Sequence, residues 1–228
     1  MVVLLKHVRE TVVYKALRLL SRLEPSVLLQ YSVQVTALLA DDEGRAAPLT
    51  PERRTLLEAT LRVCGKFDAS ELAIHAEAIA AYLDHPELTI RKEAVMALSP
   101  LANATDLPWA PASRWCGWTP ARIIVNALDD AELKVRQAAI KALKSFDVVT
   151  ILRIESEIDN ALEHEDPRVR SAAVKALGRL ELADVLRHNE AFATLMSKEE
   201  NQSVVDATVA NLKVSVLGGG MGGAEPRG

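Results

Sequence analysis

The sequence predicts an all-α fold, an α-solenoid of about five helical hairpins plus an extra N-terminal helix. Three observations predict this fold class. Residues 128–143 recur as residues 162–177, 34 positions later, and eight of the sixteen residues are identical. Apolar residues recur at spacings of three and four, as in amphipathic helices. Aromatic residues make up only 4% of the chain, which favours a helical over a β-rich protein. A repeat of this length is typical of stacked helical hairpins, each burying its apolar face against its neighbours.

The helices are expected in pairs along the chain. Residues 1–23 read as one amphipathic helix, because their apolar side chains lie mostly three and four positions apart. Pro25 favours the start of the next helix, and Thr50 would cap a helix that begins at Pro51. The expected hairpins pair residues 26–40 with 52–67, 70–83 with 88–100, 119–129 with 132–146, 149–162 with 167–180, and 184–197 with 202–213.

Four corners of the chain carry an acid where a new helix is expected to begin, namely Glu24, Asp68, Asp147 and Glu181. A carboxylate at that place favours the exposed amides and the helix dipole. The repeats are predicted to fill one domain, residues 1–215. Within it, residues 101–118 form an irregular Trp-rich insertion, and a flexible Gly-rich tail, residues 216–228, follows it.

The repeated motif consists of Leu, an acid, a turn, Val or Ile followed by Arg, and then an Ala-rich helix. This pattern resembles the HEAT repeat, and residues 90–98, 135–143 and 169–177 carry the match. Residues 204–212 are a decayed copy, with Val205 in place of the arginine. The resemblance implies that the arginine pairs with an acid ahead of the second helix, forming a ladder between repeats. By position, the ladder arginines are Arg91, Arg136 and Arg170, and the candidate acids are Asp84, Asp129 and Glu163.

Basic residues occupy equivalent positions in the two copies of the motif. Lys134 matches Arg168, and Lys141 matches Lys175. The resemblance places the second helices on the concave face, where these rows could bind an acidic peptide or a phosphate backbone. Residues 121–181 hold ten basic and eleven acidic side chains, so a solvated face without a strong positive field is the favoured interpretation of the rows. If the face does bind a partner, Lys134, Lys141, Arg168 and Lys175 are the predicted partner-binding residues.

The three tryptophans of the chain, Trp109, Trp115 and Trp118, all lie in the insertion. Rigid aromatic rings on a loop are typical of binding hot spots, so we take them as candidate partner-binding residues. Two alternatives stay open. The rings could cover the seam between repeats, or the segment could be sequence that does not belong to the protein, because its composition differs from that of its flanks.

No catalytic or cofactor site is expected. Cys64 and Cys116 lie far apart in the sequence, which indicates incidental thiols in a reducing compartment. Some HEAT-like proteins are enzymes, including bilin lyases and an iron-dependent hydroxylase that binds metal through several His-Glu pairs. Here only His164-Glu165 forms such a pair, and a two-iron site needs several. The sequence therefore predicts a non-catalytic protein-binding scaffold or adaptor that uses the concave face. A HEAT-like enzyme of bilin-lyase type is the alternative, and the hydroxylase is less favoured.

The expected partner is a protein or peptide rather than nucleic acid, because the net charge is −4. No signal peptide and no run of apolar residues long enough for a membrane span are evident, which favours an intracellular, cytoplasmic protein. The N-terminal helix is either a cap or the second helix of an incomplete hairpin. The apolar segment 2–5 would normally be covered by a neighbouring repeat, which favours a fragment of a longer array.

Overall fold

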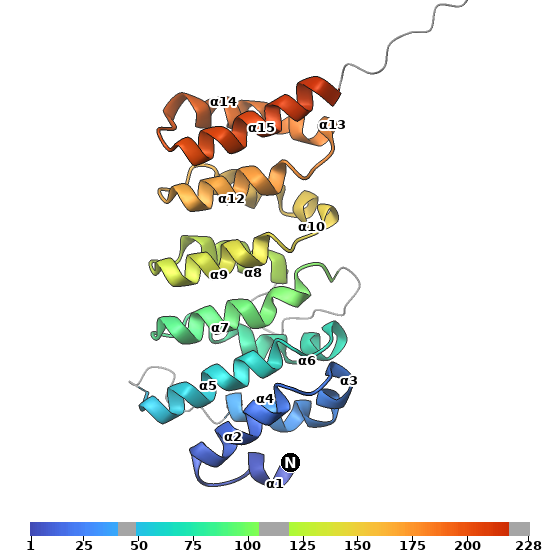
Figure 1. Ribbon diagram of the computed structural model, residues 1–228, viewed down its shortest axis with the longest axis vertical. Coiled ribbons are helices and arrows are strands. Elements are labelled where there is room, and N and C mark those ends of the chain that lie inside the picture. The colour runs from blue at the N-terminus through green and yellow to red at the C-terminus, as the bar shows by residue number, and fades with distance from the viewer. Residues whose placement is uncertain (41–48, 105–118, 219–228) are drawn as a thin grey trace, which may run out of the picture. The chain divides into compact units, whose positions relative to one another are not determined.

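The computed structural model describes residues 1–40, 49–104 and 119–218, with side chains described up to residue 212. These residues contain helices and connecting turns and no β-strand, as Figure 1 shows. The chain divides into two compact units, residues 1–145 and residues 146–228. The all-α prediction is therefore confirmed for the described part of the chain.

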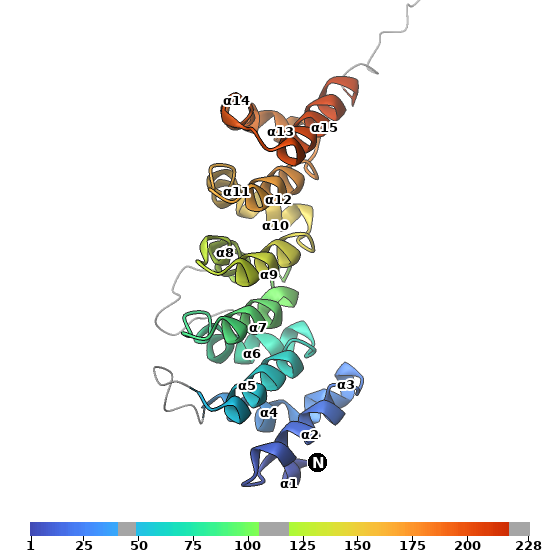
Figure 2. The same ribbon diagram turned by 60° about the vertical axis from the view of Figure 1, so that its left-hand side comes forward.

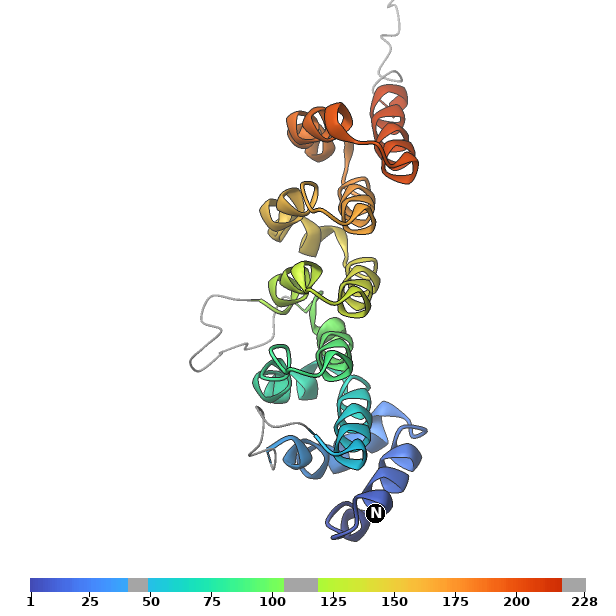
Figure 3. The same ribbon diagram turned by 90° about the vertical axis from the view of Figure 1, so that its left-hand side faces the viewer.

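The first unit contains the N-terminal helices and three hairpins. Its α-helices are α1 (Val2–Leu5), α2 (Glu10–Leu20), α3 (Pro25–Leu28), α4 (Ser32–Ala40), α5 (Pro51–Cys64), α6 (Ala69–Ala80), α7 (Leu88–Leu98), α8 (Pro120–Asn126) and α9 (Leu133–Leu143). Short 3-10 turns continue three of them: η1 (Leu29–Tyr31), η2 (Ser99–Leu101) and η3 (Ala127–Asp129). Helices α2, α5, α7 and α9 pack side by side in chain order, and α4, α6 and α8 form a second layer beside them (Figures 1 and 3).

The second unit contains the last two hairpins. Its helices are α10 (Val148–Arg153), α11 (Glu155–Ala161), α12 (Pro167–Leu177), α13 (Leu182–Val185), the 3-10 turn η4 (Leu186–His188), α14 (Asn189–Lys198) and α15 (Gln202–Gly218). The two second helices, α12 and α15, lie side by side, and α11 and α14 form the other layer (Figure 2).

The predicted N-terminal helix was wrong in one respect, because residues 1–23 form two helices. Helix α1 ends at Leu5, and α2 begins only at Glu10. In the turn between them, the His7 imidazole accepts a hydrogen bond from the Arg9 backbone N–H at 3.0 Å. A side chain that satisfies the backbone locally gives the chain an alternative to continuing the helix.

Three first helices are bent where the sequence predicted single segments. A 3-10 turn separates α3 from α4, and another separates α13 from α14. Between α10 and α11 the helix breaks at Ile154, whose φ is −120°. Thr36 donates its hydroxyl to the Ser32 carbonyl at 2.9 Å near the first bend, and such back-bonding commonly bends helices.

The helix starts follow the predicted capping chemistry in part. The Asp68 and Asp147 carboxylates accept hydrogen bonds from the backbone N–H of Glu71 and Thr150, at 2.9 and 2.7 Å. Thr50 caps α5 by accepting from Arg53 N–H at 3.2 Å. The other two corner acids, Glu24 and Glu181, stand at the N-cap position without a side-chain cap.

Helix α15 runs to Gly218, so the tail predicted to begin at residue 216 starts inside a helix. Residues 212–217 contain neither glycine nor proline, the two residues that most disfavour helix propagation. Gly218 is the first glycine after this run, and glycine commonly ends helices.

Small residues are buried in the second helices, at positions where the repeat predicts that two helices approach closely. Ala139 and Ala173 are both fully buried, in α9 and α12. Replacing Ala173 with leucine is expected to overpack the second unit and lower the free energy of unfolding by about 1–3 kcal/mol. The exposed change Lys175→Ala on the same helix is the control, with little expected effect. Thermal denaturation followed by circular dichroism measures both, and equal melting temperatures would show that the assigned helix face is wrong.

Candidate functional site

A groove of about 740 Å³ runs over three successive second helices of the first unit. Helix α5 contributes Arg62, and Lys66 follows that helix. Helix α7 contributes Lys92, and α9 contributes Lys134 and Lys141. The packing of α5 on α7 and of α7 on α9 therefore brings together cations as distant in the sequence as Arg62 and Lys141, which are 79 positions apart.

The floor of the groove is apolar and made largely of small residues. Ala97 and Ala138 are buried, and Met96 is half-buried beside them. Gly65 permits the close approach of α5 to α7, because a Cβ atom there would lie 3.0 Å from the Ala97 Cα atom. This contact is shorter than most real Cβ contacts. Small side chains thus give the groove its depth.

The groove has an excess of positive charge. Five of its lining residues are basic, and the single acidic one is Glu93. The buried Glu93 carboxylate binds Arg62 at 2.9 Å and Lys92 at 3.0 Å. Hydrogen bonding to Glu93 is the largest of the effects that raise the pKa of Arg62, and Glu58 adds to it. Glu93 therefore engages two of the five cations.

Among the residues that the structure describes, no carboxylate pairs with the other three cations of the groove, Lys66, Lys134 and Lys141. Lys66 donates to the backbone carbonyl of Ser21. Lys134 and Lys141 are exposed, and neither has an ion pair to a residue that the structure describes. Both were predicted as partner-binding residues, but no pattern in the sequence linked them to Lys66 and Lys92. The groove therefore includes Lys66 and Lys92, two cations that lie outside the local count of charges along residues 121–181.

The other two predicted basic residues lie on the second unit. Arg168 and Lys175 are exposed on α12. Trp109, Trp115 and Trp118 lie outside the described residues, as does Cys116. Cys64 is fully buried, and desolvation raises the pKa of its thiol to about 12, which makes it a poor nucleophile.

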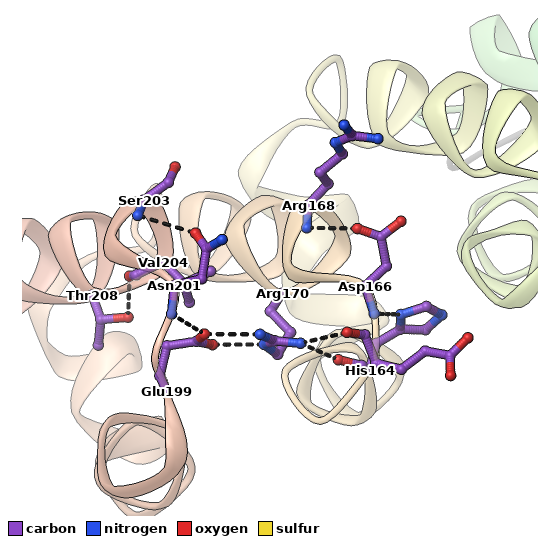
Figure 4. A network of polar contacts seen from close by, with 10 residues as sticks. His164, Asp166, Arg168, Arg170, Glu199, Asn201, Ser203, Val204 and Thr208 are labelled. Atoms are coloured by element: carbon purple, nitrogen blue, oxygen red, sulfur yellow. Dashed lines mark hydrogen bonds and ion pairs between the residues drawn. The ribbon is translucent and has the colours of Figure 1, made fainter.

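The arginine ladder anchors the turns that precede the second helices. Arg170 donates through Nη1 to the carbonyls of His164 and Glu165 at 2.7 and 2.8 Å (Figure 4). Arg91 does the same to His85 and Pro86, and Arg136 to Asp130 and Ala131. Each guanidinium thus binds two carbonyls, five and six positions before it.

Two of the ladder arginines, Arg91 and Arg170, bind acids other than the predicted ones. Arg91 forms a bidentate pair with Asp130, at 2.8 and 2.9 Å, rather than binding through Asp84. Arg170 forms one with Glu199, at 2.6 and 2.8 Å, rather than with Glu163 (Figure 4). Asp84 still acts on Arg91 through its charge. Both direct acids belong to the following hairpin, because stacking places its turn against the arginine.

The acids of these pairs occupy equivalent positions in their hairpins. Asp130 lies six residues before Arg136, and Glu199 lies six residues before Val205, which stands in place of the ladder arginine. Asp130 and Glu199 each accept a hydrogen bond from the backbone N–H two residues later. His85 and His164 occupy the same position in the other hairpins and make the same bond through Nδ1. His164 is therefore part of a turn, which argues against the metal role considered for the His164-Glu165 pair.

Hydrogen bonding to Arg170 is the main reason that the pKa of Glu199 lies below its ordinary value. Burial alone would raise the pKa of Asp130, but its bonds to Arg91 and to the Glu132 N–H outweigh burial and lower it. Carboxylates with a lowered pKa stabilise the fold above their unfolded-state pKa, and this stabilisation is lost as pH falls through the folded-state value.

A second cavity, of about 550 Å³, lies within the second unit, lined by α11, α14 and the turn that follows α11. Its charged lining contains Arg170 and Lys198 together with four carboxylates, those of Asp159, Glu163, Glu165 and Glu199. Arg170 and Glu199 are occupied by their own pair, so much of the polar lining of this cavity serves the ladder.

The described parts of the chain lack two kinds of feature. They contain no group of three or more His, Cys, Asp or Glu side chains that could hold a metal ion. None of the helices described there is long and apolar enough to cross a membrane.

Comparison with known proteins matches this geometry to one kind of fold. Residues 121–213 match the family model for HEAT repeats. A designed armadillo repeat protein, solved in complex with the peptide (KR)4, aligns with a TM-score of 0.62 at 16% identity, covering 94% of this chain and 97% of that one. No curated protein sequence matches the chain.

Two further solved structures are similar. An engineered protein aligns with a TM-score of 0.57 at 18% identity, covering 93% of this chain and 95% of the other. A structure of computationally designed armadillo repeat proteins for modular peptide recognition aligns with a TM-score of 0.56 at 16% identity, covering 93% of this chain and 97% of the other. At these identities the likeness shows the fold alone. This chain has the fold of an α-solenoid of the armadillo and HEAT kind, and its residues 121–213 match the family model for HEAT repeats.

Proposed function

We propose that the chain is a non-catalytic protein-binding scaffold, and that its second helices present the binding surface. The observation that carries the proposal is the groove over α5, α7 and α9, with its apolar floor and the exposed cations Lys134 and Lys141. A recognition site typically combines an apolar surface with a few polar groups that orient the ligand, and this groove has both.

The exposed side chains of α12 extend the proposal to the second unit. Arg168 and Lys175 occupy the positions on α12 that Lys134 and Lys141 occupy on α9. We assign the same role to this pair, as a second set of partner contacts. The tryptophans Trp109, Trp115 and Trp118 keep the role of candidate contacts that their composition suggests.

The groove is tested by filling it. Gln137 is exposed and lines the groove, so Gln137→Trp would place a large ring over the apolar floor. Peptides selected from a random display library against the whole chain are expected to lose about tenfold or more in affinity for this variant, which corresponds to about 1.4 kcal/mol. Fluorescence anisotropy with the purified peptides measures the change.

The matched control is Gln202→Trp, the same substitution at an exposed glutamine of α15. It should leave binding of the selected peptides unchanged. If Gln137→Trp binds them as tightly as the unmodified chain, or if no peptide can be selected, then the groove is not the binding surface.

A further inference from the structure

We propose that the groove over α5, α7 and α9 binds an acidic, extended peptide segment of the partner protein. This inference rests on the proposed function and specifies the chemistry of the ligand. It is drawn from the balance of charge in the groove, where five basic residues face a single carboxylate.

Glu93 decides which cations are available to a ligand. Its carboxylate is buried and binds Arg62 and Lys92, so these two form part of the wall. Arg62 also binds Glu58 at 3.1 Å, which further reduces its attraction for an incoming anion. Of the other three, Lys66 donates to the backbone carbonyl of Ser21, and Lys134 and Lys141 are exposed and without a carboxylate among the residues that the structure describes. A ligand carboxylate would bind them without displacing an existing pair.

The spacing of these two lysines fits an extended peptide. They are seven residues apart on α9, close to two full turns, and therefore share one face of the helix. At about 1.5 Å per residue, their Cα atoms are separated by roughly 10 Å along the axis. A peptide in the extended polyproline II conformation advances by about 3.1 Å per residue with three residues per turn. Acidic residues at every third position of such a ligand share one face, roughly 9 Å apart, and would match both lysines.

The rest of the groove favours a peptide over a polyphosphate. The floor of Met96, Ala97 and Ala138 offers apolar contact to the residues between the acids. The chain carries a net charge of −4, which opposes a densely charged nucleic acid, whereas a peptide with a few carboxylates needs only local attraction.

The test is a titration of the whole chain with fluorescein-labelled peptides, followed by anisotropy. One peptide carries glutamate at every third position, separated by Ser-Gly, and its matched control carries glutamine instead. We expect the glutamate peptide to bind at least about tenfold more tightly. Lys134→Glu/Lys141→Glu should remove this preference, and Lys134→Gln/Lys141→Gln should reduce it by less. Added salt should weaken binding of the glutamate peptide to the unmodified chain.

A matched charge reversal elsewhere serves as the control. Arg153→Glu/Lys198→Glu makes the same change in net charge at exposed positions of α10 and α14, and should preserve the preference for glutamate. Loss of the preference in this variant would show an effect of net charge rather than of the groove, and would overturn the inference. Tighter lysine-dependent binding of a single-stranded DNA oligonucleotide than of the glutamate peptide would also overturn it.

The outcomes separate this inference from the proposed function. If Gln137→Trp weakens selected peptides but glutamate and glutamine peptides bind equally, the groove is a binding surface and the acidic preference is wrong. The reverse outcome is also informative. If the selected peptides bind Gln137→Trp as tightly as the unmodified chain while glutamate peptides still depend on Lys134 and Lys141, the proposed contact with the groove floor is wrong and only the recognition of acidic peptides stands.

Discussion

Replacing Arg170 with alanine is expected to lower the free energy of unfolding by about 3 kcal/mol. The change leaves the Glu199 carboxylate without its bidentate partner, and that side chain is only 1% exposed. It also removes the donor from the carbonyls of His164 and Glu165. Removing one member of a mostly buried ion pair is costly because the other charge stays desolvated. Urea denaturation followed by circular dichroism measures the loss.

Arg168→Ala is the control for this prediction, because Arg168 is exposed on the same helix and its change should cost less than about 0.5 kcal/mol. Equal losses in the two variants would contradict the structural role of the ladder.

Acid is also expected to lower the free energy of unfolding of the unmodified chain. Arg170 lowers the pKa of Glu199, so the stabilisation from this pair is lost as pH falls through the folded-state pKa of Glu199. The free energy of unfolding of Arg170→Ala should therefore depend less on pH in that range.

Replacing Phe192 with alanine is expected to lower the free energy of unfolding by about 3–5 kcal/mol. Phe192 is fully buried in α14, and its ring lies edge-on to the ring of His188, with centroids 6.5 Å apart. His188 is itself buried and bonded through Nδ1 to Asp159 of α11 at 2.8 Å. Deleting the phenyl ring therefore leaves a cavity at the point where the last hairpin joins the preceding one.

Leu186→Ala provides the comparison within the same segment, since Leu186 in η4 is 46% exposed. Its effect should be a small fraction of that of Phe192→Ala. In a repeat array each hairpin contacts only its neighbours, so Phe192→Ala should loosen the last hairpin before the remainder of the chain. Hydrogen exchange measured by mass spectrometry would show this as faster exchange over α13, α14 and α15. Uniformly faster exchange along the chain would contradict it.

The sequence predicted the fold well because hairpin formation depends on local patterns. The period between Leu128 and Leu162 and the apolar spacing within each copy indicated the paired helices, and the structure contains them. The caps at Asp68 and Asp147 follow from residue type alone, since a short carboxylate readily accepts the first amides of a helix. The break after Leu5 was missed because the apolar spacing continues across it.

The contacts between hairpins were decided only by the tertiary structure. Sequence position alone suggested acids close to each arginine, whereas Arg170 binds Glu199, 29 residues away, through the stacking of α12 against the turn before α15.

The candidate site shows the same division. The sequence by itself determined the helical repeats and which face of α9 carries Lys134 and Lys141, because both follow from helical periodicity. It did not determine that Lys66 and Lys92 join them or that Glu93 engages Arg62, because these contacts depend on how far one hairpin is shifted against the next. That shift is set by close packing of small residues such as Gly65 against Ala97, which acts between segments distant in sequence and leaves no periodic pattern in either.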